Sequence, residues 1–312
     1  MTRVAAVDCG TNSLRLLVAD LDVDGGQRDL DRRMEIVRLG QGVDRTGRFA
    51  PEALDRTLTA LEGYARLIDD LGVDRVRMVA TSATRDAANR DEFVAGVERA
   101  LGVEPEVISG DEEARLSFTG ATRGLPAGLA APYLVADIGG GSTELVLGSD
   151  AVEAARSVDV GCVRLTERHF SSDPPTAAQV AAARADVAAA LNVVAETVPL
   201  DAAATLVGLA GSVTTVGAIH LGLPAYDATA IHHTRVPAAA VEEISERLLA
   251  MNHAERAAIP VMHPGRADVI AAGALVLRCI VERTAVAEVL VSEHDILDGI
   301  AWSLVTTGRA RT

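Results

Sequence analysis

The sequence of 312 residues contains no lysine, so all 29 of its basic residues are arginines. Without lysine the chain forms no Schiff base, attaches no pyridoxal phosphate and has no P-loop lysine. Cysteine is also scarce, and Cys9, Cys162 and Cys279 lie far apart in the sequence. This spacing excludes a zinc cluster and a disulfide framework, and it predicts a reduced, cytoplasmic protein.

Positive charge is in short supply overall, since 44 Asp and Glu residues give a formal net charge of −15. An acidic balance argues against non-specific binding of nucleic acid, which needs a basic surface. A long stretch without charged residues, 202–226, has four glycines and a proline. This composition predicts a buried strand, a Gly-rich turn and a helix rather than a membrane span. We therefore expect neither nucleic acid nor membrane as a partner.

Short apolar runs alternate with amphipathic windows along the chain, which is typical of an α/β protein. Its length predicts two domains, and residues 120–132, rich in Gly, Ala and Pro, are the expected linker. Strands are predicted at residues 4–7, 14–19, 76–80, 107–108, 133–136, 144–147, 206–207 and 289–291. Helices are predicted at residues 51–71, 91–101, 112–118, 176–198, from about 213 towards 219, and at 238–251, 266–283 and 295–305.

An internal repeat is the most informative feature. Residues 5–18 align with residues 134–147 at a constant offset of 129, as from Asp8 to Asp137, and each copy reads strand, Asp-x-Gly, two small or polar residues, Ser, strand. Such turns let backbone N–H groups converge on an anion, while the Asp can hold a hydrated cation. One copy alone is ordinary turn chemistry. Two copies a domain apart indicate a pair of phosphate-binding loops.

Other patterns are weaker. Arg85 follows the predicted strand 76–80, at the edge where α/β sheets bind ligands, and is either a phosphate ligand or a solvated side chain. The acidic segment 111–113 suits a general base or a metal-bridging carboxylate, or only a helix start with Asp111 as its cap. The Gly-rich residues 208–212 precede a helix, and the pair at residues 232–233, both His, predicts a surface loop.

The stretches 7–15, 81–85, 108–115, 137–144 and 264–268 together resemble the exopolyphosphatase/guanosine pentaphosphate phosphatase family. The resemblance implies an α/β fold of two ribonuclease-H-like domains around a cleft, as in actin, Hsp70 and sugar kinases. It implies a first domain of residues 1–124, on which a C-terminal helix at about 295–312 packs back, and a second domain of residues 125–294. Family members are often homodimers.

The resemblance also implies roles for individual residues. Glu113 matches the catalytic base, and Arg85 matches a phosphate-contacting arginine. Mg²⁺ is the implied cofactor, with acidic ligands at Asp8, Asp137 and Glu144. The implied phosphate cradle consists of two groups of loop residues: Gly10, Thr11, Asn12 and Ser13 in the first copy, and Gly139, Gly140, Gly141, Ser142 and Thr143 in the second.

The activity implied is hydrolysis of terminal phosphoanhydride bonds of inorganic polyphosphate, releasing orthophosphate by Mg²⁺-assisted attack of water. Guanosine pentaphosphate is the alternative substrate, and a kinase, an ATPase or a non-catalytic nucleotide sensor of the same fold is a further alternative. The chain stops before the HD-like C-terminal part of longer members, which favours short polyphosphates. Residues 296–299 read Ile-Leu-Asp-Gly where the family often has Leu-Arg-Glu-Gly.

Overall fold

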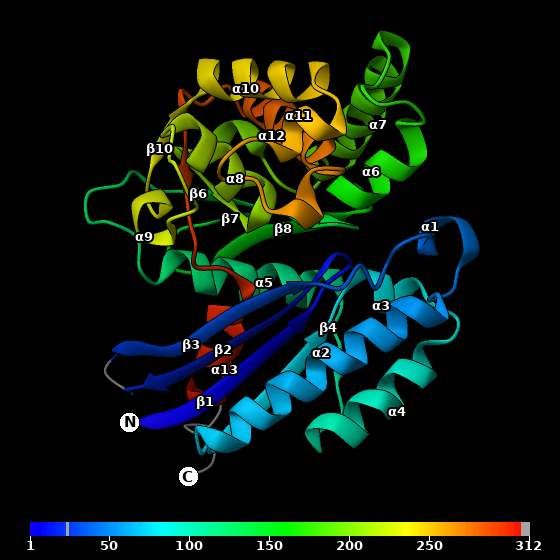
Figure 1. The fold of residues 1–312 in the computed structure, drawn as a ribbon. Coiled ribbons are helices and arrows are strands. Elements are labelled where there is room, and N and C mark those ends of the chain that lie inside the picture. Colours follow the sequence, from blue (N-terminus) through cyan, green and yellow to red (C-terminus); the bar gives the residue numbers. More distant parts are fainter. Residues whose placement is uncertain (23–24, 307–312) are drawn as a thin grey trace. The chain divides into compact units, whose positions relative to one another are not determined.

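The computed structural model describes residues 1–22 and 25–306. The chain divides into two compact units (Figure 1): residues 1–120 together with the C-terminal helix that begins at Ile296, and residues 121–295. The boundary predicted at residues 124–125 lies a few residues beyond this division, just after the helix that carries Glu113.

The first unit is a five-stranded sheet with helices on both faces. Its strands are β1 (Thr2–Cys9), β2 (Ser13–Leu21), β3 (Gln27–Ile36), β4 (Arg75–Ala80) and β5 (Glu106–Val107). Its helices are α1 (Val43–Thr46), α2 (Pro51–Asp70), α3 (Ser82–Asp86), α4 (Arg90–Leu101), α5 (Gly110–Thr122) and α13 (Ile296–Thr306). The strand order is β3-β2-β1-β4-β5, in which β1 to β3 are antiparallel while β4 and β5 run parallel to β1.

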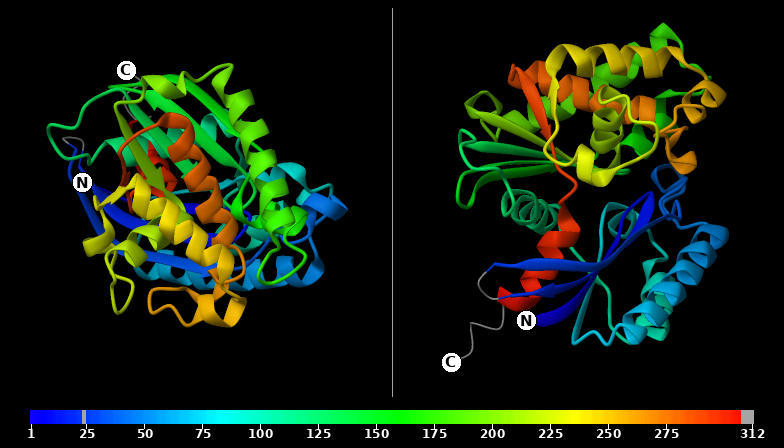
Figure 2. Two further views of the ribbon diagram at one scale, coloured as in Figure 1. Left: turned by 90° about the horizontal axis from the view of Figure 1, so that it is seen from above. Right: turned by 60° about the vertical axis from the view of Figure 1, so that its left-hand side comes forward.

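Alternate side chains of β2 enter two separate cores, because successive residues of a strand point to opposite faces. Leu14 and Leu16 pack under α2 and α4, whereas Leu17 and Leu21 pack under α13. Figure 2 shows α2 and α4 on one side of this sheet and α13 on the other. The C-terminal helix is thus an integral layer of the first unit.

The second unit repeats this plan with further helices. Its strands are β6 (Tyr133–Ile138), β7 (Thr143–Gly148), β8 (Val152–Val158), β9 (Thr205–Leu209), β10 (Arg235–Pro237) and β11 (Glu288–Val291). Its helices are α6 (Cys162–His169), α7 (Ala177–Ala195), α8 (Ala210–His220), α9 (Ala228–Ile231), α10 (Ala238–Ala250), α11 (His253–Ala257) and α12 (Ile270–Thr284), and short 3-10 turns lie at Leu200–Ala202 and Pro264–Arg266. The strand order is β10-β11-β9-β6-β7-β8.

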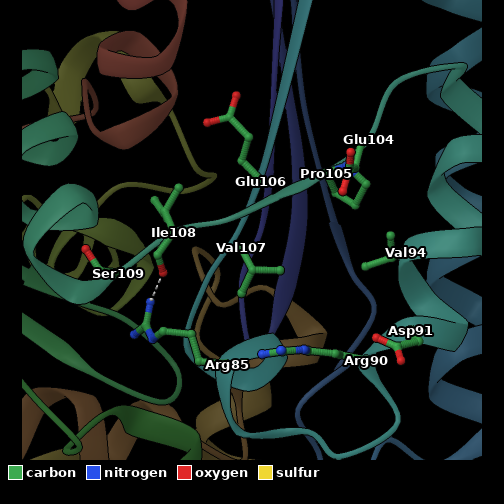
Figure 3. A pocket seen from close by; sticks show the side chains of 10 residues that line it. All are labelled: Arg85, Arg90, Asp91, Val94, Glu104, Pro105, Glu106, Val107, Ile108 and Ser109. Atoms are coloured by element: carbon green, nitrogen blue, oxygen red, sulfur yellow. Dashed lines mark hydrogen bonds between the residues drawn. The ribbon is translucent and has the colours of Figure 1, made fainter.

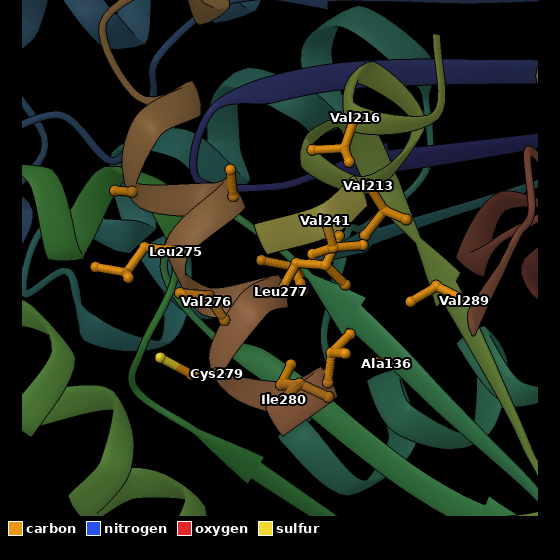
Figure 4. Close-up of a cluster of buried hydrophobic side chains, with 14 of the residues drawn as sticks. Ala136, Val213, Val216, Val241, Leu275, Val276, Leu277, Cys279, Ile280 and Val289 are labelled. Atoms are coloured by element: carbon orange, nitrogen blue, oxygen red, sulfur yellow. The ribbon is translucent and has the colours of Figure 1, made fainter. Parts of the chain in front are cut away.

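Helix α12 is the centre of the second core, with apolar side chains buried around its whole circumference (Figure 4). The charge-free stretch 202–226 forms the predicted strand, β9, and helix, α8, both buried, but not the predicted Gly-rich turn, because α8 begins directly after β9. Helix α7 is long and apolar enough to cross a membrane by length and composition alone. In the structure it packs on the second core through one face that includes Ala183, Val187 and Leu191, while most of the helix is not buried.

The two units share one topology. Three antiparallel strands, β1-β2-β3 and β6-β7-β8, are extended from the first strand by parallel strands β4 and β5, and by β9 and β11. This is the ribonuclease-H-like arrangement of the actin, Hsp70 and sugar-kinase superfamily, so the predicted fold class is confirmed. The third strands, β3 and β8, were not predicted, because both are half-exposed and lack a continuous apolar run, and β3 is mostly charged.

Candidate active site

The first loop, residues 10–13, joins β1 to β2 at the edge of the first sheet. A hydrogen bond of 3.0 Å from the N–H of Gly10 to the carbonyl of Ser13 closes it. The carbonyls of Thr11 and Asn12 each accept a hydrogen bond of 2.8 Å from the backbone of residues 38–40. Because the C=O and N–H of a trans peptide point in opposite directions, the N–H groups of Asn12 and Ser13 face away from that segment. The loop can therefore present donors to an anion.

Asp8, at the end of β1, lies directly across the hairpin from Arg15. The Arg15 Nη2 atom is 2.6 Å from Asp8 Oδ2, and Nε also donates to this oxygen at 3.0 Å. The side chain of Asp8 is only 4% exposed and that of Arg15 17%. The charge of Asp8 is thus balanced within the hairpin by a residue that the sequence reasoning missed.

The second loop, residues 139–142, is built in the same way. The N–H of Gly139 donates to the carbonyl of Ser142 at 3.0 Å. The carbonyls of Gly139 and Gly140 each accept a hydrogen bond of 2.9 Å from the first N–H groups of α6, those of Cys162 and Val163. The same peptide geometry turns the N–H groups of the next residues away from α6, so this loop too can present donors to an anion.

A pair of carboxylates lies beside the second loop. Asp137 and Glu144 are cross-strand partners in the β6–β7 hairpin, and both are buried. The hydroxyl of Ser157 donates to Glu144 Oε1 at 2.7 Å. Two neighbouring buried carboxylates repel one another and favour a cation. Mg²⁺ typically takes one or two carboxylates and fills its remaining positions with water and substrate phosphate oxygens, so this pair fits that ion.

Thr143 follows the second loop and is buried, and its hydroxyl donates to the carbonyl of Val160 at 2.5 Å. Its side-chain proton is therefore used within the fold. Any phosphate contact of Thr143 would come from its backbone.

Arg85 and Glu113 meet at the carboxyl edge of the first sheet. The N–H of Thr81 donates to the carbonyl of Cys9 at 3.1 Å, which fixes the start of α3 beside the end of β1. From α3, Arg85 Nη1 donates to Glu113 Oε2 at 2.7 Å. The same nitrogen donates to the carbonyl of Ile108 at 3.0 Å, the bond drawn in Figure 3. A candidate phosphate ligand and a candidate base thus form an ion pair.

The acidic segment at the start of α5 separates into residues with different partners. The hydroxyl of Ser109, not the predicted cap Asp111, accepts a hydrogen bond from the N–H of Glu112 at 3.2 Å. Glu112 is ion-paired with Arg77 at 2.7 Å, and Glu113 with Arg85. Of these acids Glu113 is the buried one.

A cavity of about 800 Å³ lies beside Arg85, between α4 and β5 (Figure 3). Arg85 and Arg90 line it together with three acidic residues, Asp91, Glu104 and Glu106. Its lining carries more negative than positive charge, so it does not favour a polyanion.

The Gly-rich residues 208–212 form no separate loop. Gly208 pairs within the sheet with Ala136, and α8 begins at Ala210, directly after β9. A Cβ atom at Gly211 would lie 2.2 Å from the guanidinium carbon of Arg266, so this glycine lets the arginine cover the first turn of α8.

The sequence matches the Ppx/GppA phosphatase family over residues 18–307. The chain belongs to this family. It is 54% identical to exopolyphosphatase 2 of Mycobacterium tuberculosis over 316 aligned residues, which cover 97% of this chain and 99% of that protein. Among solved structures, an exopolyphosphatase-like protein matches with a TM-score of 0.95 and 42% identity, covering 98% of this chain and 99% of the other. The Ppx/GppA family member of Aquifex aeolicus matches with a TM-score of 0.83 and 31% identity, covering 99% of both chains.

Each unit of this Ppx/GppA chain brings together its own part of the predicted site. The first holds Asp8, the first loop, Arg85 and Glu113, and the second holds Asp137, the second loop and Glu144. Among the residues that the structure describes, no group of three or more His, Cys, Asp or Glu is arranged to hold a metal ion. The predicted ligands are therefore a carboxylate pair in the second unit and an ion-paired Asp8 in the first.

Proposed function

We propose that the chain is an exopolyphosphatase, which removes orthophosphate from the ends of inorganic polyphosphate, with short chains preferred. The observation that carries this proposal is the 54% identity, over nearly the whole of both chains, to exopolyphosphatase 2 of M. tuberculosis. The duplicated loops support it, because N–H groups turned outward from two related hairpins suit a ligand with phosphates in series. The cytoplasmic location predicted from the cysteines and the homodimer implied by the family resemblance both stay predictions.

In the proposed reaction, Glu113 accepts a proton from a water molecule, and the oxygen of that water attacks the terminal phosphorus in line with the anhydride bond. The bond to the bridging oxygen breaks, orthophosphate is formed, and the shortened chain leaves with the bridging oxygen. The candidate ligands of phosphate oxygens are Arg85, Asn12 and Ser13 in the first unit and the backbone of the second loop in the second unit. Arg85 is paired with Glu113 in this structure, so the incoming phosphate competes with Glu113 for the Arg85 guanidinium. Once that guanidinium binds phosphate, Glu113 loses its cationic partner and becomes a stronger base.

The pair Asp137 and Glu144 would hold Mg²⁺ in this proposal. Asp8, the third predicted ligand, lies in the first unit and is ion-paired with Arg15. When bound, the ion neutralises negative charge on the transferred phosphoryl group. With a net charge of −15, the protein as a whole repels a polyanion, so Arg85 and the loop N–H groups supply the local attraction.

The test is orthophosphate release with Mg²⁺ from short polyphosphate, long polyphosphate and guanosine pentaphosphate in parallel. We expect release from short polyphosphate and a loss of about 10²- to 10⁴-fold in Glu113→Gln, which keeps the shape but removes the base. Asp111→Asn is the matched control, because Asp111 is an exposed acid in the same helical turn.

The other outcomes separate the alternatives. Faster release from guanosine pentaphosphate would move the substrate to that nucleotide. Consumption of polyphosphate with transfer of its terminal phosphoryl group to an added acceptor, and without release of orthophosphate, would indicate a kinase. Tight binding with no release from any of the three would indicate a sensor, and full activity of Glu113→Gln would remove Glu113 from the reaction.

A further inference from the structure

Arg77 connects three elements of the first unit, although the proposed reaction gives it no role. It lies on β4 and is mostly buried, with 15% of its side chain exposed. Its Nη2 atom is 2.6 Å from Glu106 Oε2 on β5 and 2.7 Å from Glu112 Oε1 on α5. Its Nη1 atom donates to the hydroxyl of Ser303 on α13 at 2.8 Å. One guanidinium thus holds a strand and two helices together.

The helix that Arg77 holds carries Glu113. Glu112 and Glu113 are consecutive residues in the first turn of α5, so their side chains point about 100° apart around the helix axis. Glu112 reaches Arg77 and Glu113 reaches Arg85. The first turn of α5 is therefore fixed in rotation by two arginines from different directions. We propose that Arg77 is a positioning residue that orients Glu113 through Glu112; this inference rests on the proposed role of Glu113 as the base.

Helix α13 also packs against α5. A Cβ atom at Gly299 would lie 2.0 Å from the carbonyl oxygen of Leu116, so the backbones of α13 and α5 are in direct contact there. Leu116 lies nearly one helical turn after Glu113. Ser303, the partner of Arg77 on α13, is one turn after Gly299. The glycine shared by the Ile-Leu-Asp-Gly run and its Leu-Arg-Glu-Gly counterpart thus permits the close approach that Arg77 reinforces.

The charges around Arg77 explain why it would affect the position of α5 more than the folding stability of the protein. Burial opposes its charge, but hydrogen bonds to Glu106 and Glu112 outweigh burial and raise the pKa of Arg77 above its ordinary value. Glu106 and Glu112 are themselves about half exposed, and exposed ion pairs add little to folding stability. Without the arginine, two carboxylates that now share one Nη2 atom would repel each other and displace the first turn of α5.

Arg75 provides a matched control. It lies two residues earlier on β4 and also donates to α13, from Nη1 to the carbonyl of Leu304 at 2.6 Å. Within the described part of the chain, its hydrogen bond reaches α13 and not α5. Arg75→Gln therefore removes an arginine contact with α13 and leaves the partner of Glu112 in place.

The experiment measures orthophosphate release from short polyphosphate, with kcat and KM determined separately across pH, for Arg77→Gln, Arg75→Gln, Glu113→Gln and the double variant Arg77→Gln/Glu112→Gln. We expect Arg77→Gln to lower kcat about 10- to 100-fold with little change in KM, because a displaced catalytic group slows the chemical step. The acid limb of its pH profile should move to higher pH, since a nearby cation is lost. The double variant should recover part of kcat because the repulsion is gone, and Arg75→Gln should behave as the wild type.

Equal kcat values for Arg77→Gln and Arg75→Gln would overturn the positioning role, as would a change confined to KM, or no recovery in the double variant. Thermal unfolding of each variant checks that the protein is folded. If Glu113→Gln keeps full activity, the proposed function of Glu113 and the positioning role fall together. If Glu113→Gln is inactive while Arg77→Gln is fully active, only the positioning role falls.

Discussion

The first and second loops share their backbone construction but differ in the residue that faces the aspartate at the strand end. Each loop is closed by an N–H to carbonyl bond of 3.0 Å between its first and last residues. In each hairpin the aspartate faces the second strand in an equivalent register. Asp8 faces Arg15, whereas Asp137 faces Glu144.

This single difference gives the two loops opposite electrostatic needs. The carboxylate of Asp8 is balanced by a guanidinium at 2.6 Å, so the first loop needs no ion to be stable. Asp137 and Glu144 place two carboxylates side by side in a buried site, and like charges so placed repel each other. The two hairpins thus share the backbone of the loop but place opposite charges across from the aspartate.

The largest effect that separates the loops is expected from removing each aspartate. Asp137→Asn should lower activity by about 10²-fold or more, because a metal ion provides several kcal/mol of charge stabilisation in the transition state. It should also abolish the rise in Tm on adding Mg²⁺, while Tm without Mg²⁺ is unchanged or higher because the repulsion with Glu144 is relieved. Orthophosphate release and thermal unfolding with and without Mg²⁺ measure both effects.

Asp8→Asn is the matched variant in the first loop. It leaves Arg15 without its carboxylate in a largely buried place, which should lower the free energy of unfolding by about 2 kcal/mol or more. The response of Tm to Mg²⁺ should persist. The comparison breaks if Asp8→Asn, rather than Asp137→Asn, removes that response.

A smaller effect is expected from the glycines that cover the two loops. A Cβ atom at Gly161 would lie 2.5 Å from both the carbonyl carbon and oxygen of Gly140, which are backbone atoms of the second loop. A Cβ atom at Gly40 would lie 2.3 Å from Cγ2 of Thr11 and 2.9 Å from Cβ of Ala83, which are side-chain atoms and not backbone of the first loop. Gly161→Ala should therefore lower kcat/KM about tenfold, because it moves the N–H groups of the loop.

Gly40→Ala should cost less activity, since the first loop keeps its backbone position. Both variants are compared in orthophosphate release, and thermal unfolding reports the strain of overpacking, about 1–3 kcal/mol. An equal or larger loss of activity in Gly40→Ala would show that the first loop is the more sensitive to displacement.

Much of the fold was predictable because its signals are local. The two hairpins have short apolar strands around a repeated turn, and the charge-free stretch 202–226 has the composition of a buried strand and helix. Strand β3 was missed because it lies at an edge, is half-exposed and is mostly charged, so its pairing with β2 and not its own pattern makes it a strand.

The site was predictable as a set of positions but not as a set of contacts. Arg85 follows a strand in the sequence, which correctly predicts its position at the carboxyl edge of the sheet. Glu113 lies at the start of a helix, as its acidic segment indicates. Their ion pair joins residues 28 positions apart, and the pair of Arg77 with Glu112 joins residues 35 apart. Such contacts follow from packing. The facing of Asp8 and Arg15 did have a local signal, because a tight turn at residues 10–13 fixes the register of the hairpin.

The smallest expected effect is a difference between the two units in how their stability responds to pH. All seven histidines lie in the second unit, residues 121–295. His232 and His233, predicted as a surface loop, are half-buried, with ring centroids 3.6 Å apart, and the ring of His294 lies 4.6 Å from that of His232. Burial, and then the charge of His294, lower the pKa of His233 below its ordinary 6.5. Burial, and then Arg266, do the same for His263.

A histidine whose pKa is lowered by folding binds fewer protons in the folded than in the unfolded protein. Its contribution to stability is therefore complete above pH 6.5 and declines as the pH falls below that value. In the first unit the loss of stability begins at lower pH. Hydrogen bonds from Arg3 and Arg28 lower the pKa of Asp20 from 3.8 to about 2, so the stability that Asp20 contributes declines only as the pH falls below 3.8. Hydrogen exchange should thus show protection falling in the second unit between pH 7 and pH 5, while the first unit holds until about pH 4.

His233→Asn sharpens this prediction. The backbone of His233 has φ of 65°, and asparagine tolerates this left-handed region better than most residues. The variant should therefore fold and lose part of the acid sensitivity of the second unit, because the repulsion with His294 and the buried imidazole are both removed. Equal loss of protection in both units at pH 5, or undiminished acid sensitivity in His233→Asn, would mean that the histidines do not distinguish the units, and that the charge difference between them is confined to the loops.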